Sequence, residues 1–184
     1  GFELSILELT KKSEIDELET AFMKIHALNI DEMTYYNVAL VMNGDFSPED
    51  IQYVRGLMEQ KLHFVQTAYY VDSAEKAPKG LKLIQAVRIM IFGHWSSTGE
   101  MQSGNFHTDN WSNAFVINAE MNQEGNRLPE QLISRIMKCC AYEEGWVLSK
   151  CKGVGIIGAF VSNRKCLEII PQESFRDVSK ILNL

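Results

Sequence analysis

The sequence has few of the residues that hold small or metal-dependent folds together. Among 184 residues there are four cysteines, four histidines and four prolines, and no two cysteines have the CxxC spacing. Zinc ribbons and thioredoxin-like redox sites are therefore excluded. Cys139 and Cys140 are adjacent on an expected helix, about 100° apart around its axis, which does not suit a disulfide bridge. We predict reduced cysteines that serve as small hydrophobic residues in a cytoplasmic protein.

Long apolar stretches and runs of one charge are also missing. No segment reaches the roughly 20 apolar residues of a membrane span, and the first residues lack a signal-peptide pattern. Lysine and arginine number 18 against 24 aspartate and glutamate, which gives a net charge of −6. An acidic surface without basic runs repels a phosphate backbone. The composition therefore predicts that the protein does not bind nucleic acid and is not a membrane protein.

The remaining composition is that of an ordinary globular protein, with 46% hydrophobic and 23% charged residues. Strand and helix patterns fill most of the chain, and neither an internal repeat nor a low-complexity linker interrupts them. We predict a single α+β domain over residues 1–184. Its sheet is expected to be mainly antiparallel or mixed, with about four helices packed on one face.

Four segments have the signals of helices. Ser13 and Ser47 are N-cap residues followed by apolar residues at helical spacing, while Pro129 and Pro171 begin two later helices. His26 lies beside the apolar stripe of the first helix. The expected strands are near residues 2–6, 34–42, 63–71, 81–92, 114–120, 146–151, 154–161 and 166–170. The last two are predicted to form a hairpin with its turn at residues 162–165.

The least ordinary segment is 93–113, GHWSSTGEMQSGNFHTDNWSN, which contains two tryptophans and two histidines among small polar residues. Segments of this length without apolar periodicity are often binding loops. Exposed aromatic side chains among small polar ones are typical of contact sites. We predict a binding or regulatory module, without a cofactor, that engages a protein or small ligand. Its predicted binding residues are Trp95, Phe106, Trp111 and Asn113.

The alternative hypothesis for the same segment is an enzyme, either hydrolytic or metal-dependent, that uses His94, His107 and Asp109. Histidine and aspartate can share proton transfer, and a His-x-Asp triplet on an extended segment places both side chains on one face, as two ligands of one ion require. No histidine follows His107, so a third metal ligand could come only from His94, His63 or His26. The interpretation of segment 93–113 without a functional role is a plain hairpin with a glycine-rich turn.

Two further patterns leave the function open. Gly153 to Gly158 has the spacing GxGxxG of a dinucleotide-binding loop, which requires a following helix and an acidic residue about 20 positions later. Because a strand and a hairpin turn are expected there instead, we interpret these glycines as sites of close strand packing. A homodimer through an edge strand or through the helix of Leu132 is a further hypothesis.

Overall fold

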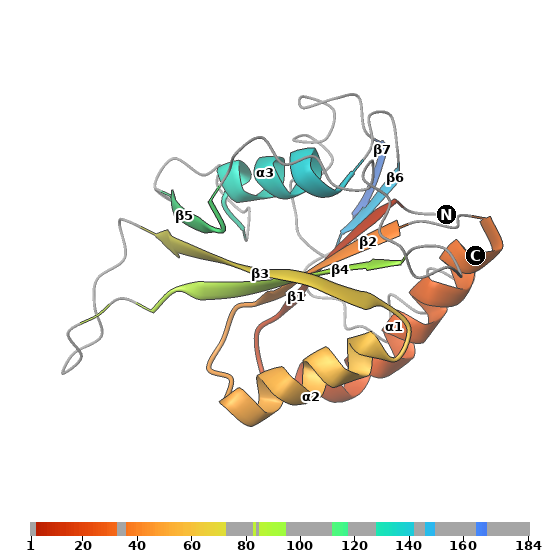
Figure 1. Ribbon diagram of the computed structural model, residues 1–184, viewed down its shortest axis with the longest axis horizontal. Coiled ribbons are helices and arrows are strands. Elements are labelled where there is room, and N and C mark those ends of the chain that lie inside the picture. The colour runs from red at the N-terminus through yellow and green to blue at the C-terminus, as the bar shows by residue number, and fades with distance from the viewer. Residues whose placement is uncertain are drawn as a thin grey trace.

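A computed structural model describes residues 3–32, 36–72, 83, 85–94, 112–117, 128–141, 146–149 and 165–168. Within these residues the chain forms a seven-stranded sheet and three helices (Figure 1). In chain order the elements are β1 (Leu4–Leu9), α1 (Ser13–Glu32), β2 (Tyr36–Met42), α2 (Pro48–Glu59), β3 (His63–Asp72), β4 (Val87–His94), β5 (Ala114–Ile117), α3 (Glu130–Cys140), β6 (Trp146–Ser149) and β7 (Lys165–Glu168). The helix predicted after Pro171 and the strand predicted at 154–161 lie outside the described residues.

The sheet is mixed, with the strand order β5-β3-β4-β2-β1-β6-β7. Only β4, among the described strands, is antiparallel to its neighbours, β2 and β3. The other four pairs are parallel. The prediction of a mixed sheet is confirmed and that of a mainly antiparallel one is wrong. Hydrophobic alternation identifies a strand but carries no information about the direction of its partner.

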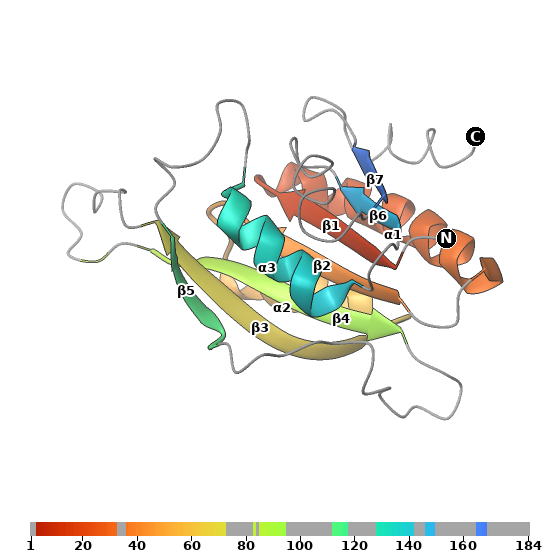
Figure 2. The ribbon, with the colours of Figure 1, turned by 90° about the horizontal axis from the view of Figure 1, so that it is seen from above.

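The helices cover both faces of the sheet, and not one face as predicted. Helices α1 and α2 pack on one face and α3 on the other (Figures 1 and 2). All residues of β1 and β2 are buried, which is the pattern of strands covered on both sides. Along β1, Leu7 and Leu9 face α1 and α2, whereas Leu4 and Ile6 face α3.

The start of α2 agrees with the sequence in detail. Ser47 accepts a hydrogen bond from the Asp50 amide, and Asp50 accepts one from the Ser47 amide, which makes a capping box with Pro48 at the first helical position. The hydrogen bond from the Ser47 amide is the main cause that lowers the pKa of Asp50.

The first strand of the predicted hairpin, at 154–161, lies outside the described residues, so the hairpin with its turn at 162–165 stays a prediction. Strand β7 begins within that range and pairs in parallel with β6, in the register Ser149↔Glu168. Parallel neighbours require a crossover connection and cannot be joined by a tight turn. Residues 150–164, which make this connection, lie outside the part of the chain that the structure describes.

No helix in the described ranges is long and apolar enough to cross a membrane.

Candidate functional site

The connections of β1 and β6 identify a candidate site at the edge of the sheet that is formed by the carboxyl ends of these strands. These strands are parallel neighbours. From β1 the chain continues through α1 to β2 on one side, and from β6 it continues to β7 on the opposite side. The strand order therefore reverses between β1 and β6. In open α/β sheets, ligands bind outside the carboxyl ends of the strands at such a switch point.

A buried carboxylate lies at this edge. Glu8, the second-last residue of β1, is only 3% exposed and accepts a hydrogen bond from Asn43 Nδ2 to its Oε2 atom at 3.1 Å. Asn43 follows the end of β2, and its backbone amide donates to the Leu9 carbonyl. The two strand ends are thus joined through both a backbone and a side-chain hydrogen bond, which fixes the position of the Glu8 carboxylate.

A second carboxylate closes the turn from β1 into α1. Glu14 Oε1 accepts hydrogen bonds from the Thr10 amide at 2.8 Å and from the Thr10 hydroxyl at 2.6 Å. Glu14 is 8% exposed, while the neighbouring Lys11 and Lys12 are exposed. Lys12 also pairs with Asp50 of α2 at 3.5 Å. This edge therefore combines two buried acidic groups with exposed cations.

The loop after β2 approaches the end of β1 closely. A Cβ atom on Gly44 would overlap the Thr10 carbonyl oxygen and would lie 3.0 Å from the Phe46 ring. Because the nearest atom belongs to the backbone, a side chain at Gly44 would have to push the two loops apart.

Replacing Gly44 with alanine should therefore lower the free energy of unfolding by about 1–3 kcal/mol, the usual range for overpacking. Urea denaturation measures this change. The matched control is Gly56→Ala on α2, where a Cβ would meet nothing within 4 Å. A helical glycine in open space gains up to about 1 kcal/mol on replacement by alanine. Equal stability of the two variants would contradict the close approach at Gly44.

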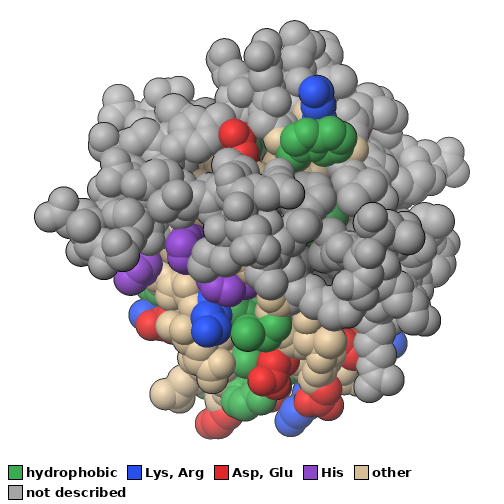
Figure 3. All heavy atoms as spheres, turned by 90° about the vertical axis from the view of Figure 1, so that its right-hand side faces the viewer, with side chains coloured by type: hydrophobic (Ala, Val, Ile, Leu, Met, Phe, Trp, Pro, Cys, Tyr) green, Lys and Arg blue, Asp and Glu red, His purple; other side chains and the backbone are tan. Residues whose placement is uncertain are grey.

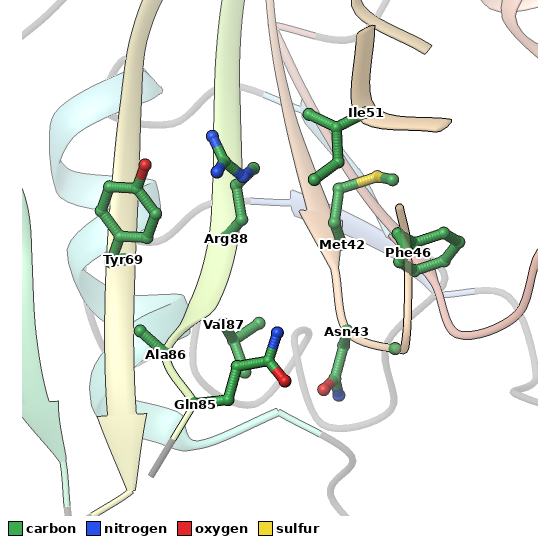
Figure 4. A pocket seen from close by; sticks show the side chains of 10 residues that line it. Met42, Asn43, Phe46, Ile51, Tyr69, Gln85, Ala86, Val87 and Arg88 are labelled. Atoms are coloured by element: carbon green, nitrogen blue, oxygen red, sulfur yellow. The ribbon is translucent and has the colours of Figure 1, made fainter. Parts of the chain in front are cut away.

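A cavity of about 300 Å³ lies along the same edge, between the end of β2 and the beginning of β4 (Figure 4). Its walls are aromatic, apolar and amide side chains with one cation. Arg88 lies 5.2 Å from the centre of the Tyr69 ring. The residues lining it are Met42, Asn43, Gly44, Phe46, Ile51, Tyr69, Gln85, Ala86, Val87 and Arg88. Asn43 belongs both to this cavity and to the contact with Glu8, so the two features are adjacent.

Most of the predicted site falls outside the described residues. That is the case for Trp95, Phe106 and Trp111 and for the proposed catalytic pair of His107 and Asp109. Asn113 is described, and its side chain donates to the Thr67 carbonyl at 3.0 Å, beside the pairing of β5 with β3. In the structure this residue joins two strands.

His94 is the last residue of β4, at the opposite edge of the sheet from the switch point. It lies next to His26 of α1, with the ring centres 5.5 Å apart. Among the residues that the structure describes, no group of three histidine, cysteine, aspartate or glutamate side chains is placed to hold a metal ion.

Sequence reasoning missed Glu8 and Asn43. The one available signal was a glutamate within the apolar run LSILEL, followed by an asparagine after the next apolar strand. A charged residue near the end of a buried strand is seldom buried without a partner. It should therefore be considered together with the polar residue that ends the next strand.

Comparison of the chain with known proteins shows which solved structures have a similar fold. Neither a protein-family model nor a curated protein matches the chain. The structure of the M1.HpyAVI complex with S-adenosylmethionine is similar, with a TM-score of 0.65 and 12% identity, over 100% of this chain and 89% of that one. The Thermus thermophilus protein TTHA0409 with S-adenosylmethionine, described as a DNA modification methylase, has a TM-score of 0.62 and 12% identity, over 98% and 84%.

A third similar structure is the cytosine-N4-specific PvuII DNA methyltransferase. It has a TM-score of 0.55 and 12% identity, and the likeness covers 100% of this chain and 85% of that one. At these identities the likeness shows the fold, which is the mixed α/β fold of these methyltransferases.

These comparisons contradict the prediction of a protein-binding or regulatory module, because solved structures that share the fold are named as a DNA methyltransferase and a DNA modification methylase. The alternative of a hydrolytic or metal-dependent enzyme has no support among them. The prediction that nucleic acid is not a partner is contradicted as well, since these enzymes are named for DNA. That prediction relied on the net charge of the whole chain, which does not report the local charge at one edge, where Lys11 and Lys12 are exposed.

Proposed function

We propose that the chain is an S-adenosylmethionine-dependent methyltransferase that acts on DNA. The observation that supports this most directly is the reversal of strand order between β1 and β6. The fold of the chain resembles the S-adenosylmethionine complexes of M1.HpyAVI and of a DNA modification methylase over 100% and 98% of its length. The cofactor would bind at the carboxyl ends of β1 and β6, outside the sheet.

The residues at this edge fit the charge of the cofactor. S-adenosylmethionine has a sulfonium and an ammonium group, both cationic, and the buried carboxylates of Glu8 and Glu14 provide the opposite charge. Buried carboxylates beside a cationic ligand form the stronger, charge-assisted class of hydrogen bond. Asn43 would keep the Glu8 carboxylate in place while the ligand binds.

The sequence after β6 has features suited to bind the adenosine part of S-adenosylmethionine. Gly153 to Gly158 follows β6 with the GxGxxG spacing, and Glu168 ends β7, the next strand of the sheet. In doubly wound folds a glycine-rich turn after the first strand and an acidic residue at the end of the next hold the nucleotide, the acid through the ribose hydroxyls. Glu168 is ten positions after Gly158, which is closer than the roughly 20 positions of that fingerprint. Because β7 is parallel to β6, residues 150–164 make a crossover connection, as a nucleotide-binding turn between two parallel strands also does.

The cavity beside β2 would receive the acceptor base. Enzymes that modify a base take it out of the stack into a pocket, where aromatic side chains stack on it and polar groups bind its edge. Tyr69 provides the aromatic ring, the amides of Asn43 and Gln85 provide donors and acceptors, and Arg88 provides a cation. When bound, S-adenosylmethionine supplies a methyl group that leaves the sulfonium sulfur for a nucleophilic atom of the base.

Two measurements test the proposal. We expect S-adenosylmethionine to bind with one-to-one stoichiometry in calorimetry, and to raise stability by about 2.7 kcal/mol at a concentration 100 times its dissociation constant. We also expect radiolabelled methyl groups to pass from the cofactor to duplex or single-stranded DNA. Absence of binding at millimolar cofactor would overturn the proposal. Binding without transfer to any DNA would overturn the enzymatic part of it.

A further inference from the structure

A cluster of aromatic and titratable side chains lies at the opposite edge of the sheet, and the proposed function does not use it. Tyr36 is the first residue of β2 and His94 is the last residue of the antiparallel strand β4, so the two are directly paired across the strands. His26 lies in the second half of α1. These three residues, far apart in sequence, form what we call the histidine corner. Histidine side chains gather on this part of the surface, next to a cationic side chain (Figure 3).

The three rings contact one another. His26 Nδ1 and the Tyr36 hydroxyl form a hydrogen bond of 2.5 Å. The Tyr36 and His94 rings stack with centres 5.4 Å apart and planes 20° apart, and His26 meets His94 edge-on with centres 5.5 Å apart. Tyr36 is 2% exposed, whereas both histidines are half-buried. Protons can therefore reach a contact that joins α1 to two strands.

The surroundings of His26 favour its neutral form. Burial is the main cause that lowers the pKa of His26, and the positive charges of His94 from β4 and Lys61 from the turn after α2 lower it further. Burial also raises the pKa of Tyr36, so its hydroxyl stays neutral and offers no negative charge. His63, at the beginning of β3, lies opposite Gly93 in the neighbouring strand and is exposed.

We propose that His26, Tyr36 and His94 form a proton-operated latch, which holds the second half of α1 against the sheet at neutral pH and releases it in acid. Protonation of His26 would place a positive charge beside the His94 ring and near Lys61, in a half-buried site. Moving α1 away from the sheet lets water solvate that charge.

The direction of the pH effect follows from proton binding. His26 has a lower pKa in the folded chain than its ordinary value of 6.5, so the released state takes up a proton more readily. The stabilisation is fully present above pH 6.5 and is lost as the pH falls below that value. Release is expected to be local, because Ile15 and Leu18 hold the first half of α1 in the core independently.

The contact can be tested by amide hydrogen exchange at pH 8.0 and pH 5.0, with rates corrected for the intrinsic effect of pH. In the unmodified protein without ligand, exchange of residues 23–32 should become at least about tenfold faster at pH 5.0, while residues 13–20 and α2 change little. His94→Gln should reduce this response to less than about threefold. His63→Gln is the matched control and should leave it unchanged.

Three outcomes would overturn the latch. The first is equal exchange of residues 23–32 at both pH values. The second is acceleration over the whole chain, which indicates general acid unfolding, and the third is an unaltered response in His94→Gln. Tyr36→Phe adds a test at pH 8.0, where loss of the hydroxyl should already accelerate exchange of residues 23–32. None of these measurements involves the cofactor, so failure of the latch is distinguishable from failure of the proposed methyltransferase function.

Discussion

Replacing Glu8 with glutamine should lower the affinity for S-adenosylmethionine roughly 10- to 100-fold, with a comparable loss of methyl transfer. The substitution keeps the shape of the side chain and removes its negative charge. A hydrogen bond to a charged group contributes about 1.5–3 kcal/mol, and each 1.4 kcal/mol is about tenfold in a dissociation constant. Because Glu8 is 3% exposed, little water competes for this interaction. Isothermal titration calorimetry measures the change directly.

The control for this variant is Glu59→Gln, which removes the same charge from the exposed end of α2. It should bind the cofactor as the unmodified protein does. Thermal unfolding without ligand separates a binding effect from a folding effect, since Glu8→Gln retains an acceptor oxygen for Asn43. If Glu8→Gln bound the cofactor with unchanged affinity, the carboxylate would not face the ligand and its place in the site would be wrong.

Asn43 connects the two parts of the proposed site. Its side chain donates to Glu8 on the face covered by α3, and the residue also lines the cavity that opens toward α2. A cofactor at the ends of β1 and β6 and a base in that cavity would lie on either side of one fixed loop. The close approach of Gly44 to Thr10 keeps this loop in place. The geometry therefore offers a reason for glycine after Asn43 that the sequence alone does not give.

Local features of the fold could be predicted from the sequence. The serine at position 47, the proline after it and the apolar spacing that follows were sufficient to place α2, since capping and periodicity act within a few residues. The same holds for α3, which the sequence predicts to begin at Pro129 and which buries five residues of one face. These are Leu132, Ile133, Ile136, Met137 and Cys140.

The arrangement of the strands could not be predicted in the same way. Strand direction depends on the crossover connections between strands, and a short run such as Lys165–Glu168 looks alike in a hairpin and in a parallel pair. The histidine corner was missed because its members come from α1, β2 and β4. The sequence places His26 beside the apolar stripe of its helix and among the possible metal ligands, and neither pattern brings it next to Tyr36. The net charge misled for a related reason, since one sum cannot describe a surface with separate acidic and basic regions.

Phe92→Ala should lower the free energy of unfolding by about 3–5 kcal/mol, the usual range for removing a buried phenylalanine. Phe92 is fully buried in the core shared with α1 and α2, on the strand between β2 and β3. Its ring meets Phe64 of β3 edge-to-face at 5.7 Å and lies opposite Val38 of β2. Removal of the Phe92 ring would therefore leave an empty space where the antiparallel strand β4 joins the two halves of the sheet.

Urea denaturation followed by circular dichroism measures this loss, with an unchanged m-value as evidence that only stability differs. The matched control is Tyr53→Ala, which truncates an aromatic ring that is 58% exposed on α2 and should change stability by less than about 0.5 kcal/mol. A loss below about 1 kcal/mol for Phe92→Ala would mean that β4 does not lie between β2 and β3 as described. In that case the cavity at its first residues, and the acceptor site proposed there, would lose their structural basis.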